Sequence, residues 1–219
     1  MPSSTSRYRD WVDKRNDPLD RKQIAYAALD AYEEIANRDL IQLDDLTPII
    51  TAAKSQYMTV WDVGTVFLVR LAETHIAAQG AMLEIMDSPK AKERLHLIWA
   101  LTARLPEDFR MNIIRKAISD RAKRVRTIAA AKADLFGFKE LLLELEAQRD
   151  RESDDDVRNT LQFHIVMLRS GYILERDADG NPCLSVRTKN GWTSPRITQE
   201  DIDQGRLGSK IEEMQTKDY

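Results

Sequence analysis

An arginine recurs at intervals of 32 residues in the second half of this chain. The three are Arg94, Arg126 and Arg158, and each opens an apolar helical run that follows an acidic or turn-forming cluster. A repeat of this length is typical of stacked helix pairs, because one pair alone cannot bury its apolar face. The period therefore predicts a mainly α fold, an α-solenoid of helix pairs.

The composition agrees with a folded, helical chain. Hydrophobic residues make up 42% of the 219 residues, whereas glycine (8) and proline (7) are scarce, which favours helices over a β-sandwich. The net charge of −3 does not by itself indicate a nucleic-acid or membrane partner. The single cysteine, Cys183, excludes an intrachain disulfide and fits a reducing compartment.

No membrane or secretory signal is predicted. The start of the chain, Met1 to Arg7, lacks the apolar segment of a signal peptide. No apolar run approaches the roughly 20 residues that a membrane-spanning helix needs. We therefore expect a cytoplasmic protein with no membrane partner.

Apolar residues at helical spacing predict the element boundaries. The first 18 residues are expected to form a flexible N-terminus, in which Tyr8, Trp11 and Val12 dock as one short turn. Helices are predicted at about 19–38, 47–57, 59–72 and 74–86, with Gly64 and Gly80 interrupting the apolar stretch. Along the 32-residue period, first helices should start near residues 74, 106 and 138, and second helices near 89, 122 and 154.

Matching apolar columns support this alignment. In the first helices Ala81, Ile113 and Leu145 coincide, and in the second helices Leu97, Ala129 and Leu161 coincide. These positions should be buried between stacked pairs. An irregular helical bundle with an accidental period remains the alternative.

The repeat resembles HEAT-type repeats, which carry an aspartate in the turn between helices and a Val-Arg pair in the second helix. Asp120 with Val125-Arg126 and Asp154 with Val157-Arg158 match this pattern, while Arg94 lacks the preceding valine. The resemblance covers about residues 74–170. It implies that the aspartates and arginines bond between successive repeats, so we interpret the set as structural: Arg94, Asp120, Arg126, Asp154 and Arg158.

The pattern changes after residue 170, which predicts a helical-repeat domain at 19–170 and a small αβ cap at 171–219. Gly171 should end the last helix. Alternating runs at 172–176 and 183–188 flank a turn, and Asn190-Gly191 should form a second turn before a strand at 192–197. Thr198 and the acid at Asp201 should start a terminal helix that continues to about residue 214.

Basic residues gather in one region and suggest a binding surface. Residues 90–132 hold twelve Lys/Arg and four Asp/Glu. The candidate binding residues are Arg110, Arg115, Lys116, Arg121, Lys123 and Arg124. They predict a non-catalytic protein-binding module, an inhibitor, immunity-type protein or regulator, whose protein partner presents an acidic patch. A solvated helix face with paired charges is the competing interpretation.

A nucleic-acid function is the alternative to protein binding. Residues 157–173, followed by a hairpin, resemble the last helix and wing of winged-helix domains. The resemblance implies contacts from Arg158, Asn159, Gln162 and His164. Too few residues lie between Arg149 and Asp154 for the preceding helix of such a domain.

Some helical-repeat proteins are DNA alkylation-repair glycosylases, which use tryptophans and a catalytic aspartate. The candidate residues for such a function are Trp61, Asp62 and Trp99. Trp99 lies in an apolar run, however, where we expect its side chain to be buried. No recognisable catalytic motif occurs, and the three histidines lack metal-ligand spacing, so no cofactor or metal is predicted. We expect Cys183 to be a packing residue in a strand.

Overall fold

A computed structural model of the protein describes residues 4–188 and 191–216. Its contacts divide the chain into two compact units, Met1–Ile128 (unit 1) and Ala129–Tyr219 (unit 2). The boundary falls inside one helix of the predicted 19–170 domain and not at residue 170. Within the described ranges, every helix is too short or too polar to span a membrane.

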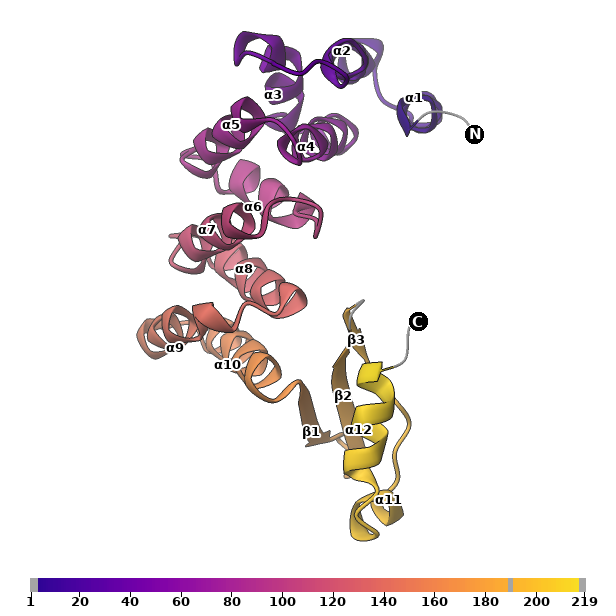
Figure 1. The fold of residues 1–219 in the computed structure, drawn as a ribbon, viewed down its shortest axis with the longest axis vertical. Coiled ribbons are helices and arrows are strands. Elements are labelled where there is room, and N and C mark those ends of the chain that lie inside the picture. Colours follow the sequence, from indigo (N-terminus) through magenta and orange to yellow (C-terminus); the bar gives the residue numbers. More distant parts are fainter. Residues whose placement is uncertain (1–3, 189–190, 217–219) are drawn as a thin grey trace. The chain divides into compact units, whose positions relative to one another are not determined.

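Unit 1 is built of helices in two layers. Helix α4 contacts α6 and helix α5 contacts α7, so alternate helices lie side by side (Figure 1). The bounds are α1 Ser4–Asp13, α2 Leu19–Ile35, α3 Thr47–Ala53, α4 Met58–Ala72, α5 Ile76–Met86, α6 Ala91–Ala100, α7 Glu107–Ile118 and the start of α8 Lys123–Phe136. The predicted helix starts near 74, 89, 106 and 122 are thus confirmed to within two residues.

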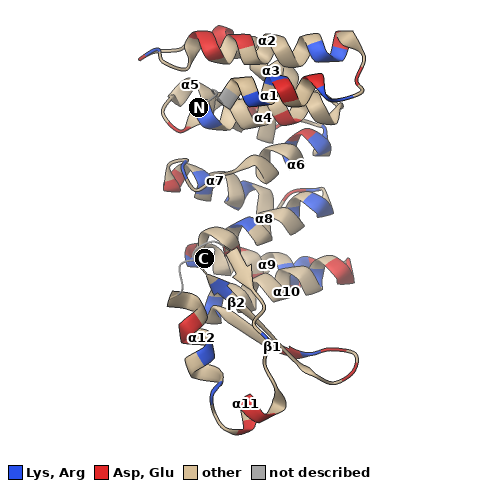
Figure 2. Cartoon of the chain, turned by 90° about the vertical axis from the view of Figure 1, so that its right-hand side faces the viewer, with Lys and Arg blue, Asp and Glu red and all other residues tan. Residues whose placement is uncertain are grey.

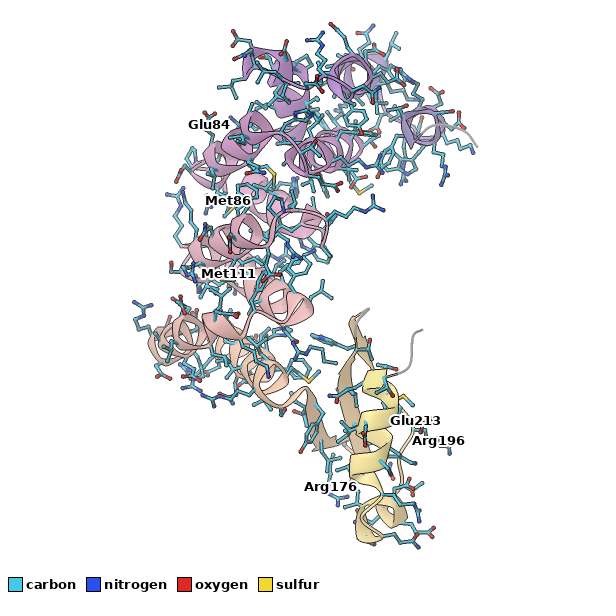
Figure 3. The ribbon with its side chains drawn as sticks, viewed as in Figure 1. Glu84, Met86, Met111, Arg176, Arg196 and Glu213 are labelled. Carbon is cyan, nitrogen blue, oxygen red and sulfur yellow. The ribbon has the colours of Figure 1, made fainter. Side chains whose placement is uncertain are left out.

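The apolar columns of the repeat form the core between the layers. Ala81, Leu97 and Ile113 are all at most 1% exposed. Side chains occupy the space between these helices (Figure 3), where Met86 of α5 is buried while Glu84 of the same helix projects outward. Helical periodicity explains this arrangement, because residues three or four apart share one face.

Gly64 and Gly80 do not interrupt helices, which corrects the sequence-based prediction. Gly64 lies inside α4, where an added Cβ would lie 2.1 Å from the backbone nitrogen of Ala53. The missing side chain therefore lets α3 and α4 approach closely. Gly80 lies inside α5 with no atom within 4 Å of such a Cβ, so nothing in its packing requires glycine.

Residues 4–13 of the predicted flexible N-terminus form helix α1. Val12 is fully buried, and the ring of Tyr8 packs edge-on against Phe67 with centroids 5.1 Å apart. Arg9 adds ion pairs to Asp30 and Glu33 of α2. Helix α1 forms because these contacts fix it against α2 and α4, a tertiary effect that its polar composition does not reveal.

Unit 2 contains helices followed by an antiparallel sheet. The bounds are the remainder of α8, α9 Leu142–Arg151, α10 Asp155–Ser170, β1 Tyr172–Arg176, β2 Pro182–Thr188, β3 Gly191–Thr193, α11 Gln199–Asp203 and α12 Leu207–Thr216. The strands are ordered β1-β2-β3, and Leu174 pairs with Leu184 in the register of β1 and β2. Gly171 ends α10 at φ +78°, as predicted.

The end of unit 2 has its own small core and departs from the prediction in detail. Leu184, Val186, Ile197 and Ile211 form a buried cluster. The capping box of Thr198 and Asp201 is confirmed, but the predicted single helix is two, α11 and α12, separated by a turn with Gly205 at φ +68°.

Two strand predictions also change. Strand β3 ends at Thr193, short of the predicted residue 197, and Asn190 of the predicted turn lies outside the described residues. Cys183 is exposed and not a packing residue. It alternates with the buried Leu184, so it lies on the opposite face of β2.

Candidate functional site

The three periodic arginines make the same local contact. Each guanidinium donates to the backbone carbonyl six residues earlier: Arg94 to Ser88, Arg126 to Asp120 and Arg158 to Glu152. The bond satisfies a carbonyl oxygen in the turn before the helix that carries the arginine. The three guanidinium groups thus share one local contact, each with the turn before its own helix.

Arg94 also joins one helix pair to the next. Its Nε and Nη2 donate to the two carboxylate oxygens of Asp120 at 2.6 and 2.7 Å, and both side chains are under 10% exposed. Burial raises the pKa of Asp120, but the bonds from Arg94 and from the Ala122 N–H outweigh burial, so the pKa lies below its usual value. Such a paired, buried carboxylate is structural.

The six basic residues proposed for partner binding have different environments. Arg110 is 8% exposed, Lys116 pairs with Asp87, and Arg121 donates to the carbonyl of Pro89. Lys116 and Arg121 are nonetheless exposed, as are Arg115, Lys123 and Arg124, and Arg115 donates to Asn112 Oδ1 at 3.1 Å. Basic and acidic segments both occur on the helices of unit 1 (Figure 2).

The residues of the winged-helix alternative all lie in α10 and differ in exposure. His164 is 3% exposed, and its Nδ1 lies 3.1 Å from Asp134 Oδ2. Gln162 accepts a bond from Arg149 at 2.7 Å, and Arg158 is bonded as described above. A buried His164 has no access to a DNA base, whereas Arg158, Asn159 and Gln162 of the same set are exposed.

A cavity of about 540 Å³ lies between α4 and α6 in unit 1. We call it the Trp61 pocket, and its lining residues are Trp61, Asp62, Val66, Leu95, His96, Trp99 and Ala100. Trp61 and Asp62 come from the first half of α4, whereas His96 and Trp99 come from the second half of α6. The packing of α4 against α6 brings together residues more than 30 positions apart.

Trp99 is 59% exposed, so the predicted burial of this residue is wrong. The buried face of α6 carries Arg94, Leu97 and Ile98. Trp99 follows Ile98 by one helical step of about 100°, which turns its indole away from that face. A large aromatic side chain is thus presented beside the cavity.

His96 is buried beneath Trp61. Its ring stacks on the indole with centroids 3.7 Å apart and an interplanar angle of 17°. Burial, and secondarily the nearby Lys92, lowers the pKa of His96 to about 4. The imidazole is therefore neutral at physiological pH.

The Nδ1 atom of His96 has no hydrogen-bond partner among the described residues. An unsatisfied buried polar atom costs about 1–3 kcal/mol. A ligand that supplied a partner would recover part of this free energy.

Asp62 separates the Trp61 pocket from a second cavity. That cavity has a volume of about 300 Å³ and is lined by Arg7, Tyr8, Trp11 and Asp62. Burial raises the pKa of Asp62, and the nearby Arg15 only partly opposes this effect. The carboxylate is thus partly desolvated, with aromatic rings on both sides and no hydrogen-bond donor on its oxygens among the described residues.

The sequence nominated Trp61, Asp62 and Trp99 only for the glycosylase alternative, and it missed His96. His96 and Trp99 stand three residues apart, which places them on neighbouring positions of a helix surface. That spacing indicates that His96 and Trp99 lie close together on α6. Their contact with Trp61 depends on the packing of α6 against α4, which the spacing does not predict.

The described residues contain no group of three or more histidine, cysteine or acidic side chains placed to hold a metal ion. Comparison with protein-family models, with curated proteins and with solved structures finds no match for this chain. The case for function therefore comes from the geometry of the Trp61 pocket.

Proposed function

We propose that the protein is a non-catalytic protein-binding module and that the Trp61 pocket is the centre of its binding surface. The observation that carries the proposal is the 59% exposed indole of Trp99 at a cavity that also holds Trp61 and Asp62. Tryptophan, tyrosine and arginine are enriched among the residues that dominate interface energies. Tyr8 and Trp11 extend the aromatic surface on the far side of Asp62.

Binding by this surface would inhibit or regulate the partner, as an immunity-type protein does. The members of the basic set that are exposed would form a flanking contact with acidic groups of that partner: Arg115, Lys116, Arg121, Lys123 and Arg124. Arg110 is buried and is assigned to the fold.

We also propose that residues 74–170 are HEAT-like repeats of an α-solenoid. The equal contacts of Arg94, Arg126 and Arg158 with the carbonyl six residues earlier support this interpretation. The bidentate pair of Arg94 with Asp120 supports it as well, because it links successive helix pairs.

Affinity capture with matched tryptophan variants tests the binding site. Three tagged proteins would be crosslinked in lysate: the wild type, Trp99→Ala and Trp192→Ala. The proteins captured by each would then be compared, with and without nuclease treatment. Trp192 is a suitable control because it is 46% exposed and belongs to unit 2. A partner that is lost with Trp99→Ala alone and survives nuclease supports the proposal, whereas equal capture by all three contradicts it.

Recognition of an alkylated DNA base is a second candidate. The observation that favours it is that Trp61, Asp62 and Trp99 line one cavity. Alkylation at a ring nitrogen makes a purine cationic, and such a base would stack on the indoles beside the carboxylate. Release of 7-methylguanine from methylated DNA by the wild type and not by Asp62→Asn would establish this activity.

A further inference from the structure

Resting on the proposed function, we propose that the Trp61 pocket binds the guanidinium group of an arginine side chain presented by the protein partner. The pocket combines three features that this group satisfies together: flat aromatic walls, an unpaired carboxylate and an unpaired ring nitrogen.

The walls suit a flat, weakly hydrated cation. Trp61 and Trp99 line the cavity from two different helices, and Val66, Leu95 and Ala100 complete an apolar lining. A guanidinium is planar and stacks on aromatic faces, whereas an ammonium is a compact and strongly hydrated charge.

The charge of the pocket comes from Asp62. This carboxylate is partly desolvated by burial. The positive charge of Arg15 lowers its pKa by less than burial raises it, and Arg15 forms no hydrogen bond or ion pair with it. His96 is neutral, so it does not supply a competing positive charge. A ligand cation that reaches Asp62 would form a charge-assisted hydrogen bond in a partly desolvated environment.

His96 provides the second polar partner. Its side chain is 6% exposed, and its Nδ1 is unpaired although the residue lines the cavity. A guanidinium has five N–H donors in a fixed fork, so it carries donors for His96 in addition to those that bond a carboxylate.

Unit 1 already holds arginines on aromatic rings. The Arg15 guanidinium lies 4.7 Å from the ring centroid of Trp11, and Trp11 lines the second cavity together with Asp62. Arg21 lies 3.6 Å from the ring centroid of Tyr57. The aromatic side chains of unit 1 therefore accept the stacking geometry that the proposal requires.

The proposal is tested by titrating the intact protein with small probes and following the indole N–H signals of Trp61 and Trp99 by NMR. The probes are N-acetylarginine methylamide, its lysine analogue and its citrulline analogue, a neutral isostere. Binding of a single side chain is expected to be weak, with a Kd of roughly millimolar order. We expect the arginine probe to bind about tenfold more tightly than the citrulline probe and more tightly than the lysine probe.

Two variants locate the interaction. Asp62→Asn should remove the preference for arginine over citrulline, and Trp99→Ala should weaken the arginine probe about tenfold. Trp192→Ala is the control and should leave both affinities unchanged. Retention of the indole and methyl NMR signals outside the pocket checks that each variant is folded.

The outcomes separate this inference from the proposed function. Equal binding of arginine and citrulline, or no binding of either, overturns guanidinium recognition. Partner capture that still depends on Trp99 would then leave the binding module itself standing. Tighter binding of 7-methylguanosine than of the arginine probe would overturn the inference in favour of a nucleic-acid base.

Discussion

At the scale of single residues, the bidentate pair of Arg94 and Asp120 is the contact whose loss should be most costly. Arg94→Ala leaves a buried carboxylate without its cation, and removal of one partner of a buried pair costs about 3–5 kcal/mol. Urea unfolding measures the change in the free energy of unfolding. The exposed Arg124→Ala is the matched control and should change stability by less than about 0.5 kcal/mol. Equal stabilities of the two variants would contradict the structural role of the pair.

His96 should make the stability of the protein depend on pH. Its pKa is about 4 in the folded protein, against an ordinary value of 6.5. Between these two values the unfolded chain binds more protons than the folded one, so stability is lost as the pH falls through this window. The loss attributable to His96 is on the order of 3 kcal/mol.

A variant isolates this effect from other acid-sensitive groups. His96→Phe keeps an aromatic ring beneath Trp61 but does not titrate. Free energies of unfolding at pH 7.5, 5.5 and 4 should therefore fall less steeply in the variant than in the wild type. If the free energy of unfolding falls equally steeply with pH in the variant and the wild type, the pKa of His96 does not differ between the folded and unfolded states.

At the scale of elements, the crossing of α3 and α4 depends on Gly64. Gly64→Ala places a methyl group against the backbone of Ala53 and should destabilise the protein by about 1–3 kcal/mol or more. Gly80→Ala is the matched control, since its Cβ meets nothing within 4 Å inside α5. It should stabilise the helix by about 0.5–1 kcal/mol. Thermal melting of both variants should shift in opposite directions, and a shift in the same direction would contradict the close crossing.

At the scale of the whole molecule, the two compact units should respond separately to core mutations. Leu184→Ala removes a side chain from the small core of unit 2, at a cost of about 2–5 kcal/mol. Hydrogen exchange should become faster in β1 and β2 of unit 2 and stay unchanged in α4 of unit 1. Faster exchange in both units would show that they unfold as one.

Most of the helices and their boundaries are predictable from the amino-acid sequence. Periodic apolar residues, the turn before each arginine and the glycine at residue 171 are local signals, because a helix is defined by contacts three and four residues apart. The predicted starts near 122 and 154 and the capping box of Thr198 with Asp201 follow from such signals. The resemblance to HEAT-type repeats predicted a bond between an arginine and the aspartate of the next repeat. Arg94 and Asp120 form such a bond, and both residues are identified by their positions in the repeat pattern.

The candidate site depends on packing between segments that are distant in the sequence. Trp61 and His96 are separated by 35 positions, and nothing local indicates that their rings stack. The exposure of Trp99, the burial of His164 and the helix at the N-terminus likewise depend on which face each element turns toward its neighbours. Periodicity shows that a face is apolar, but the partner of that face is set by packing between distant segments, which is why the pocket emerged from the structure and not from the sequence.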